Sequence, residues 1–166
     1  DKSKTSKTTA AIPEPKHSPT PEATPNRILK ANEKFVGLVG LYVTVPEGMT
    51  FRQEPDANSE RPDVIGFYIE KEIEGEVTYQ LYGIYPASRG ASEDGLMKAR
   101  AEMDASTVKE VTVGGYKGIE GLVTGPKTRW LTLIIKDGKL FTFSTYPTML
   151  ENKAITDQIL STASFQ

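Results

Sequence analysis

The stretch RWLTLIIK, from Arg129 to Lys136, decides the fold class because its apolar residues do not alternate with polar ones. Successive side chains of a strand point to opposite faces of its sheet. Both alternating sets are mostly apolar here, with Trp130, Thr132 and Ile134 on one face and Leu131, Leu133 and Ile135 on the other. A strand with one face in water does not need this pattern. We therefore predict an α+β fold, an α/β/α sandwich with a central, largely antiparallel sheet.

Turn residues on both sides of this stretch predict neighbouring antiparallel strands. Asp137-Gly138 is the strongest hairpin signal in the chain, and Glu74-Gly75 and Gly114-Gly115 mark two further tight turns. Residues 35–45 predict either one strand or two short pieces joined by a bend. The other predicted strands are residues 50–53, 64–73, 76–85, 109–113, 116–124, 129–136 and 140–146.

Two segments have the pattern of helices that pack on a sheet. Ser92 is placed as the N-cap of the first, which we expect to end near Ser106. Thr148 and Glu151 have the spacing of a capping box and predict the start of the second. The side chains on the predicted sheet-facing sides are Leu96, Ala99 and Met103 in the first helix and Ile155, Ile159 and Thr162 in the second.

Composition limits the classes of function. The chain has 166 residues, with 20 Lys and Arg against 22 Asp and Glu and a net charge of -2, so it lacks the positive field that holds nucleic acid. No apolar run approaches the roughly 20 residues that a membrane-spanning helix needs. The absence of cysteine removes disulfides, thiolate metal sites and thiol nucleophiles. The length fits one domain with one core.

Residues 1–27 have the composition of a disordered tether, rich in Ser, Thr, Lys and Pro and without aromatic residues. Such a segment cannot bury enough apolar surface to offset the entropy of ordering it. We predict this tether followed by a single domain at residues 28–166. His17 is the only histidine and lies in the tether, where we expect no catalytic or metal-binding role. Because the chain starts at Asp1 and not at methionine, we expect it to be part of a longer precursor, beginning either after a targeting segment or at an arbitrary boundary.

Several phrases of the sequence resemble the PsbP family, named for the extrinsic lumenal protein of photosystem II. They are LYVTVPEG (41–48), VGGYKGIEG (113–121), KDGKLF (136–141), Thr145-Tyr146, and ILST (159–162) before Phe165. The likeness covers about residues 35–165 and implies the α/β/α sandwich. Met49 and Thr50 stand where the photosystem proteins tend to place a tryptophan. Together with the tail, this favours the bacterial lipoprotein branch of the family.

The tail and the resemblance together predict a location and a function. We expect an extracytoplasmic, monomeric protein of the cell envelope, periplasmic or on the outer surface, held to the membrane only by an N-terminal lipid anchor upstream of the chain. Non-catalytic binding of a protein or an envelope component, without nucleic acid and without a cofactor, is the predicted function. The alternatives are a domain that binds a divalent metal or a small ligand, and a PsbP-type accessory subunit of photosystem II.

Catalytic patterns are missing from the sequence. A hydrolase triad needs a base beside a nucleophile, and the predicted domain has neither histidine nor cysteine. No Gly-x-Ser-x-Gly segment, Walker pattern or Gly-x-Gly-x-x-Gly segment occurs. We therefore predict that the chain is not an enzyme, with a hydrolase of unrecognised site as the remaining rival.

Acidic residues give the candidate metal ligands, because carboxylate oxygens suit hard divalent cations. The first set alternates around the predicted hairpin tip: Glu70, Glu72, Glu74 and Glu76. The second lies in a polar loop limited by two prolines: Asp56, Glu60 and Asp63. For both sets the alternative is a solvated surface, with Lys71 as a partial counterion at the hairpin.

Aromatic residues give the candidate binding residues. The tyrosines of the predicted strands either line a groove or are half-buried packing residues: Tyr68, Tyr79, Tyr82, Tyr85 and Tyr116. Arg129 and Trp130 form either a recognition hot spot or, for the tryptophan, a packing contact beneath a helix.

Overall fold

A computed structural model describes residues 23–37, 39–54, 64–86 and 93–166. Most of the predicted tether, the proposed N-cap Ser92 and the acidic loop with Asp56, Glu60 and Asp63 lie outside these residues. The described part is an α+β fold in which every strand pairing is antiparallel, in agreement with the predicted class.

A seven-stranded sheet forms the centre, in the order β3-β4-β5-β9-β8-β7-β6. Its strands are β3 (Thr50–Glu54), β4 (Val64–Ile73), β5 (Glu76–Pro86), β6 (Lys109–Val113), β7 (Tyr116–Val123), β8 (Arg129–Lys136) and β9 (Lys139–Tyr146). Glu74 and Gly75 have φ of 54° and 81°, and Asp137 and Gly138 have φ of 52° and 71°. Positive φ at both central residues is the geometry of a two-residue hairpin turn, as the sequence predicts at both places.

A second, three-stranded sheet contains β1 (Glu33–Val36), β2 (Leu41–Thr44) and β10 (Ser164–Phe165), with β2 in the middle. The prediction of two short pieces within residues 35–45 is therefore the correct alternative. The separate sheet was not predicted, because it depends on the pairing of Ser164 with Tyr42 across most of the chain.

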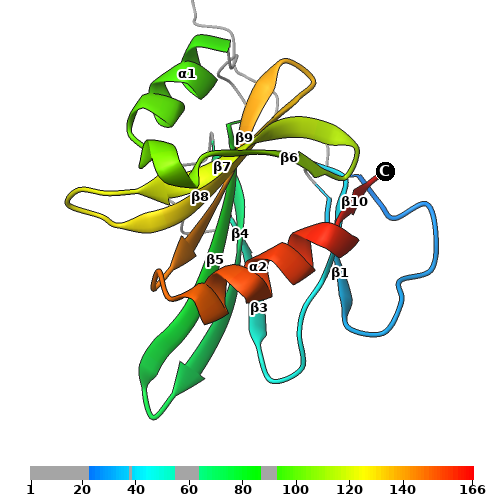
Figure 1. Ribbon diagram of the computed structural model, residues 1–166. Helices are drawn as coiled ribbons and strands as arrows, with labels where there is room; N and C mark the ends of the chain where they lie inside the picture. The colour runs from blue at the N-terminus through cyan, green and yellow to red at the C-terminus, as the bar shows by residue number, and fades with distance from the viewer. Residues whose placement is uncertain (1–22, 38, 55–63, 87–92) are drawn as a thin grey trace, which may run out of the picture.

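Helix α2 (Leu150–Thr162) and the small sheet cover one face of the large sheet. In Figure 1 this helix, drawn in orange to red, runs beside β5 towards β1 and β10. The shared core contains side chains from every layer: Leu41 and Val43 of β2, Phe67 and Ile69 of β4, Tyr79 and Leu81 of β5, Phe141 and Phe143 of β9, and Ile159 and Leu160 of α2.

The predicted capping box at the start of α2 is wrong. Helix α2 begins at Leu150, and its N-cap residue Met149 makes no side-chain capping bond. Thr148 contributes its backbone oxygen instead, which accepts a hydrogen bond of 2.8 Å from the indole nitrogen of Trp130. Trp130 is half-buried, and Lys153 of α2 lies 5.5 Å from the centre of its ring. This is the predicted packing contact beneath a helix.

Helix α1 (Glu93–Ala101) and the short 3₁₀ helix η1 (Ala105–Thr107) lie on the opposite face, over β7 and β8. Helix α1 ends before the predicted Ser106, and Asp104 caps η1 by accepting from the Ser106 backbone N–H. Met103 packs over Gly121, where an added Cβ would lie 2.6 Å from the methionine sulfur. The core on this face contains Met103, Ile119, Val123, Leu131 and Leu133. Both faces of β8 are therefore covered, as its sequence predicts.

One buried hydrogen-bond network fixes α2 to the large sheet. The hydroxyl of Thr156 lies 2.7 Å from that of Tyr79 on β5 and 2.6 Å from that of Thr145 on β9. All three residues are 3% exposed or less. Burial raises the pKa of the Tyr79 phenol above its ordinary value, although its contact with Thr156 acts in the opposite direction. The phenol is therefore held neutral beneath the helix.

We expect Thr156→Val to lower the free energy of unfolding by about 1–3 kcal/mol, because it leaves two buried hydroxyls without their partner at nearly unchanged volume. The matched control is Thr112→Val on β6, where the threonine is exposed and the change should stay within about 0.5 kcal/mol. Urea denaturation measures both. Equal stabilities for the two variants would contradict the role of the network.

The last residues of the predicted tether contact the folded domain. The backbone N–H of Asn26 donates to the phenol of Tyr42 at 3.1 Å and to the side chain of the terminal residue Gln166 at 2.8 Å. Arg27 binds Glu33 through two hydrogen bonds of 2.6 and 3.0 Å. The guanidinium of Arg27 lies 3.9 Å from the ring centre of Tyr42. The two ends of the described chain are thus joined at the small sheet.

The contact with Arg27 predicts a pH dependence of stability. Its hydrogen bond is the main reason that the pKa of Glu33 lies below the ordinary 4.5. The ionised carboxylate therefore stabilises the folded state above pH 4.5, and this contribution is lost as the pH falls through the folded-state pKa. Denaturation at pH 7 and pH 3 should show that Glu33→Gln is destabilising at pH 7 and less so at pH 3.

Glu110→Gln is the matched control, since Glu110 is exposed on β6 and makes no ion pair within the described part of the chain. Its effect should be small at both pH values. A destabilisation by Glu33→Gln that is the same at pH 3 and pH 7 would contradict the assignment.

Candidate binding groove

The two central strands of the large sheet carry different side chains on their two faces. On β9, Phe141 and Phe143 are buried on the α2 side, whereas Thr142 and Ser144 point to the α1 side and are half-buried. β5 follows the same rule, with Leu81 buried and Tyr82 half-buried. Because side chains of a strand alternate, one face of each strand completes the core and the other is available for contacts.

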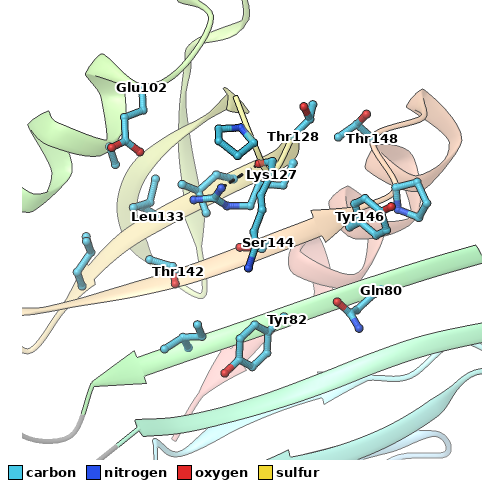
Figure 2. A pocket seen from close by; sticks show the side chains of 17 residues that line it. Gln80, Tyr82, Glu102, Lys127, Thr128, Leu133, Thr142, Ser144, Tyr146 and Thr148 are labelled. Atoms are coloured by element: carbon cyan, nitrogen blue, oxygen red, sulfur yellow. Dashed lines mark hydrogen bonds between the residues drawn. The ribbon is translucent and has the colours of Figure 1, made fainter. Parts of the chain in front are cut away.

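Helix α1 covers this second face over β7, β8 and Leu140 at the start of β9, so the described residues leave a groove over β5 and the rest of β9. The groove has a cavity volume of about 1020 Å³. Figure 2 shows its floor and walls, with Thr142, Ser144, Gln80 and Tyr82 on the strands and Glu102, Lys127 and Thr128 above them. Its remaining lining is Ile84, Ala99, Pro126, Arg129, Leu131, Leu133, Leu140, Tyr146, Pro147 and Thr148.

An aromatic stack forms one wall of the groove. The rings of Tyr68 and Tyr82, which are paired across β4 and β5, lie 4.1 Å apart with an angle of 8° between their planes. The guanidinium of Arg52, the next residue in this cross-strand row, lies 3.6 Å from the centre of the Tyr68 ring. On the groove side, Tyr82 is paired with Ser144 of β9. Along this cross-strand row, the two large rings are followed by the short hydroxyl side chain of Ser144.

The floor of the groove offers polar side chains on a fixed backbone. Gln80, Thr142 and Ser144 form no side-chain hydrogen bond within the described ranges of the chain. Their strands are paired on both sides, β5 with β4 and β9 and β9 with β5 and β8. The backbone groups at the floor are thus paired with neighbouring strands, so a ligand would be recognised by the side chains.

Three charged side chains line the groove beside the neutral side chains of β5 and β9. Lys127 belongs to the turn between β7 and β8, and Arg129 follows it at the start of β8 and donates to the Lys127 carbonyl at 3.1 Å. Glu102 stands on the opposite side, after α1. The groove is thus lined by both signs of charge and, between them, by neutral polar and apolar groups.

The predicted tyrosines separate into two groups. Tyr79 and Tyr85 are buried on the α2 side, and Tyr116 is half-buried with its ring 5.2 Å from that of Phe165. These three are packing residues. Tyr82 lines the groove, and Tyr68 is stacked on the far side of its ring. Among the predicted aromatic residues, the groove-lining alternative thus holds for Tyr82 alone.

Arg129 and Trp130 do not form one hot spot, because they lie on opposite faces of β8. Arg129 lines the groove, and Trp130 packs against the start of α2. Adjacent residues of a strand point to opposite faces, so this separation follows from the strand itself.

The structure does not bring the predicted acidic ligands together. Glu70 forms an ion pair of 3.1 Å with Arg52. Glu72, Glu74 and Glu76 are exposed at the hairpin tip, and the strand register shifts between Lys71 and Glu72. Asp56 and Asp63 lie outside the described residues. Among the residues that are described, no group of three or more acidic or histidine side chains is arranged to hold a metal ion.

The sequence contained one signal of the groove. β9 reads FTFST from Phe141 to Thr145, with Thr142 between two phenylalanines, and in β5 Gln80 stands between Tyr79 and Leu81. This alternation is typical of a sheet that is sealed on one side only. The signal was overlooked because the prediction applied the two-sided apolar pattern of β8 to every strand of the sheet.

Comparisons of the chain with protein-family models, with curated proteins and with solved structures found no match. In the part of the chain that is described, neither helix has the length and apolar character needed to cross a membrane.

Replacing groove residues should leave stability nearly unchanged. We expect Ser144→Ala and Gln80→Ala to change the free energy of unfolding by about 0.5 kcal/mol or less, because neither side chain has a hydrogen bond to lose. Asn152→Ala should cost about 1–3 kcal/mol, since its buried amide donates to the carbonyls of Thr78 and Pro147 at 3.0 and 2.9 Å. Thermal or urea denaturation measures the difference. A large loss of stability in Ser144→Ala would show that the floor serves the fold.

Proposed function

We propose that this chain is a non-catalytic binding domain of PsbP-like fold, exported and tethered to the cell envelope, and that the groove on the α1 side is its binding site. Its ligand is a protein or an envelope component. The observation that carries the proposal is the row of neutral polar side chains on the groove floor, at Gln80, Thr142 and Ser144, which the fold does not use. Polar groups that converge in a largely apolar hollow are the usual features of a ligand site.

The rigidity of the floor supports a binding role. β5 and β9 are central strands of the sheet, and their opposite face is packed with the aromatic core beneath α2. The backbone of such strands keeps its position without a ligand, so little backbone entropy is lost when one binds.

The environment of the groove hydroxyls favours binding over catalysis. Neither Thr142 nor Ser144 is hydrogen-bonded to a base within the described residues, and the sequence has no cysteine. A serine or threonine needs such a base to become a nucleophile.

The family part of the proposal rests on the PsbP-like phrases of the sequence, which lie at turns of the fold. Pro46-Glu47-Gly48 follows β2, where Gly48 has a φ of 79°. Gly114-Gly115 joins β6 to β7, and Asp137-Gly138 joins β8 to β9. In each case the phrase contains a glycine with positive φ, which the turn requires.

A fragment screen by NMR tests the groove as the binding site. With ¹⁵N-labelled protein and a library of neutral polar and aromatic fragments, we expect the shifts of binding fragments to cluster at Gln80, Tyr82, Thr142 and Ser144. Ser144→Trp should abolish these shifts by filling the groove above β9. Thr112→Trp, a matched change on exposed β6, should preserve them.

Gln80→Ala serves as a second variant if Ser144→Trp fails to fold, and it should weaken the fragments that hydrogen-bond to the floor. Fragments that bind only elsewhere on the domain, or no binding at all, would contradict the proposed site.

A further inference from the structure

We propose that the groove takes a linear oligosaccharide. This rests on the proposed function, because it names the ligand class of the same site. Three properties of the groove carry the inference: its neutral floor, its aromatic wall and its length.

The floor matches the hydroxyl groups of a sugar. The Gln80 amide both donates and accepts hydrogen bonds, and so do the hydroxyls of Thr142 and Ser144. Each hydroxyl of a sugar is likewise both donor and acceptor, so either group of a pair can act as the donor of the hydrogen bond. None of the three side chains carries a charge that would have to be desolvated and neutralised.

The aromatic wall matches the C–H face of a pyranose ring. Tyr82 lines the groove, and Tyr68 is stacked on it at 4.1 Å on the side away from β9, which fixes the plane of the ring. At the far end of β9, Tyr146 is 56% exposed and also lines the groove. Two aromatic side chains separated along the groove suit a ligand of repeating rings better than a single compact molecule.

The length of the groove suits a chain of several sugar units. Its floor follows β9 from Leu140 to Tyr146, which at about 3.3 Å per residue is about 20 Å. The cavity volume of about 1020 Å³ is at the upper end of the range for compact ligands.

An extended peptide fits the floor less well. Peptides in grooves beside a sheet usually pair their backbone with an edge strand. β5, β9 and β8 are all interior strands whose two edges are already paired. A peptide would therefore find only the side chains of the floor as partners for its regularly spaced backbone groups, and no strand edge with which to form a ladder.

NMR titration and calorimetry with chitotetraose, cellotetraose and tetragalacturonate test the inference, with a Gly-Ser hexapeptide as the peptide arm. We expect at least one tetrasaccharide to bind saturably and to shift the amides of Gln80, Tyr82, Thr142 and Ser144. Tyr82→Leu and Gln80→Ala should each weaken that binding about tenfold, the equivalent of one lost contact. Gln158→Ala on the exposed side of α2 is the matched control and should leave the affinity unchanged.

The outcomes separate the two proposals. If fragments or the hexapeptide bind in the groove and no tetrasaccharide does, the oligosaccharide inference is overturned and the binding site remains. If no probe of any class shifts the groove residues, the proposed site fails as well. Saccharide binding that is unaffected by both Tyr82→Leu and Gln80→Ala would also overturn the inference.

Discussion

The structure depends on the packing of aromatic side chains from β5 and β9 beneath α2 and the small sheet. Tyr79, Phe141 and Phe143 fill this layer, and the hydroxyl of Thr156 ties the helix to Tyr79 and Thr145. Because strands alternate, committing these residues to one face commits their neighbours to the other. The short side chains of Thr142 and Ser144 therefore stand on the α1 side, where large residues would have closed the groove.

The extent of α1 then decides where that second face is covered. Leu96 and Ala99 pack over the core that Met103 forms with β7 and β8, and the helix does not cover β5. The space between is bounded by the Tyr68 and Tyr82 rings on one side and by the β7–β8 turn on the other. A rigid sheet that is covered on one face and only partly covered on the other thus forms a hollow, whose polar side chains project from strands that the core behind them holds in place.

Local sequence signals predicted the strands of the large sheet well. The features that were not predicted depend on contacts between residues that are distant in the sequence. Asp137-Gly138 adopts the positive φ values that its turn requires, and β8 is covered on both faces as its apolar residues imply. The pairing of β10 with β2 has no local signal, since it joins the chain's end to its beginning. The capping box failed because helix α2 begins at Leu150, which makes Met149 and not Thr148 its N-cap. A groove was only one of two alternatives for the strand tyrosines, because its position depends on where α1 ends relative to β5, and the alternation in β9 shows only that one face of that strand is polar.

The central claim is that one face of the β5–β9 pair is sealed and the other is accessible to ligands. Methyl relaxation in the presence of a soluble gadolinium chelate tests it directly, because Leu81 and Ile84 lie on opposite faces of the same strand. We predict strong relaxation enhancement at the methyl groups of Ile84 and Thr142 and little at those of Leu81 and Ile69. Equal protection of all four would show that the groove is closed in solution and would contradict the account.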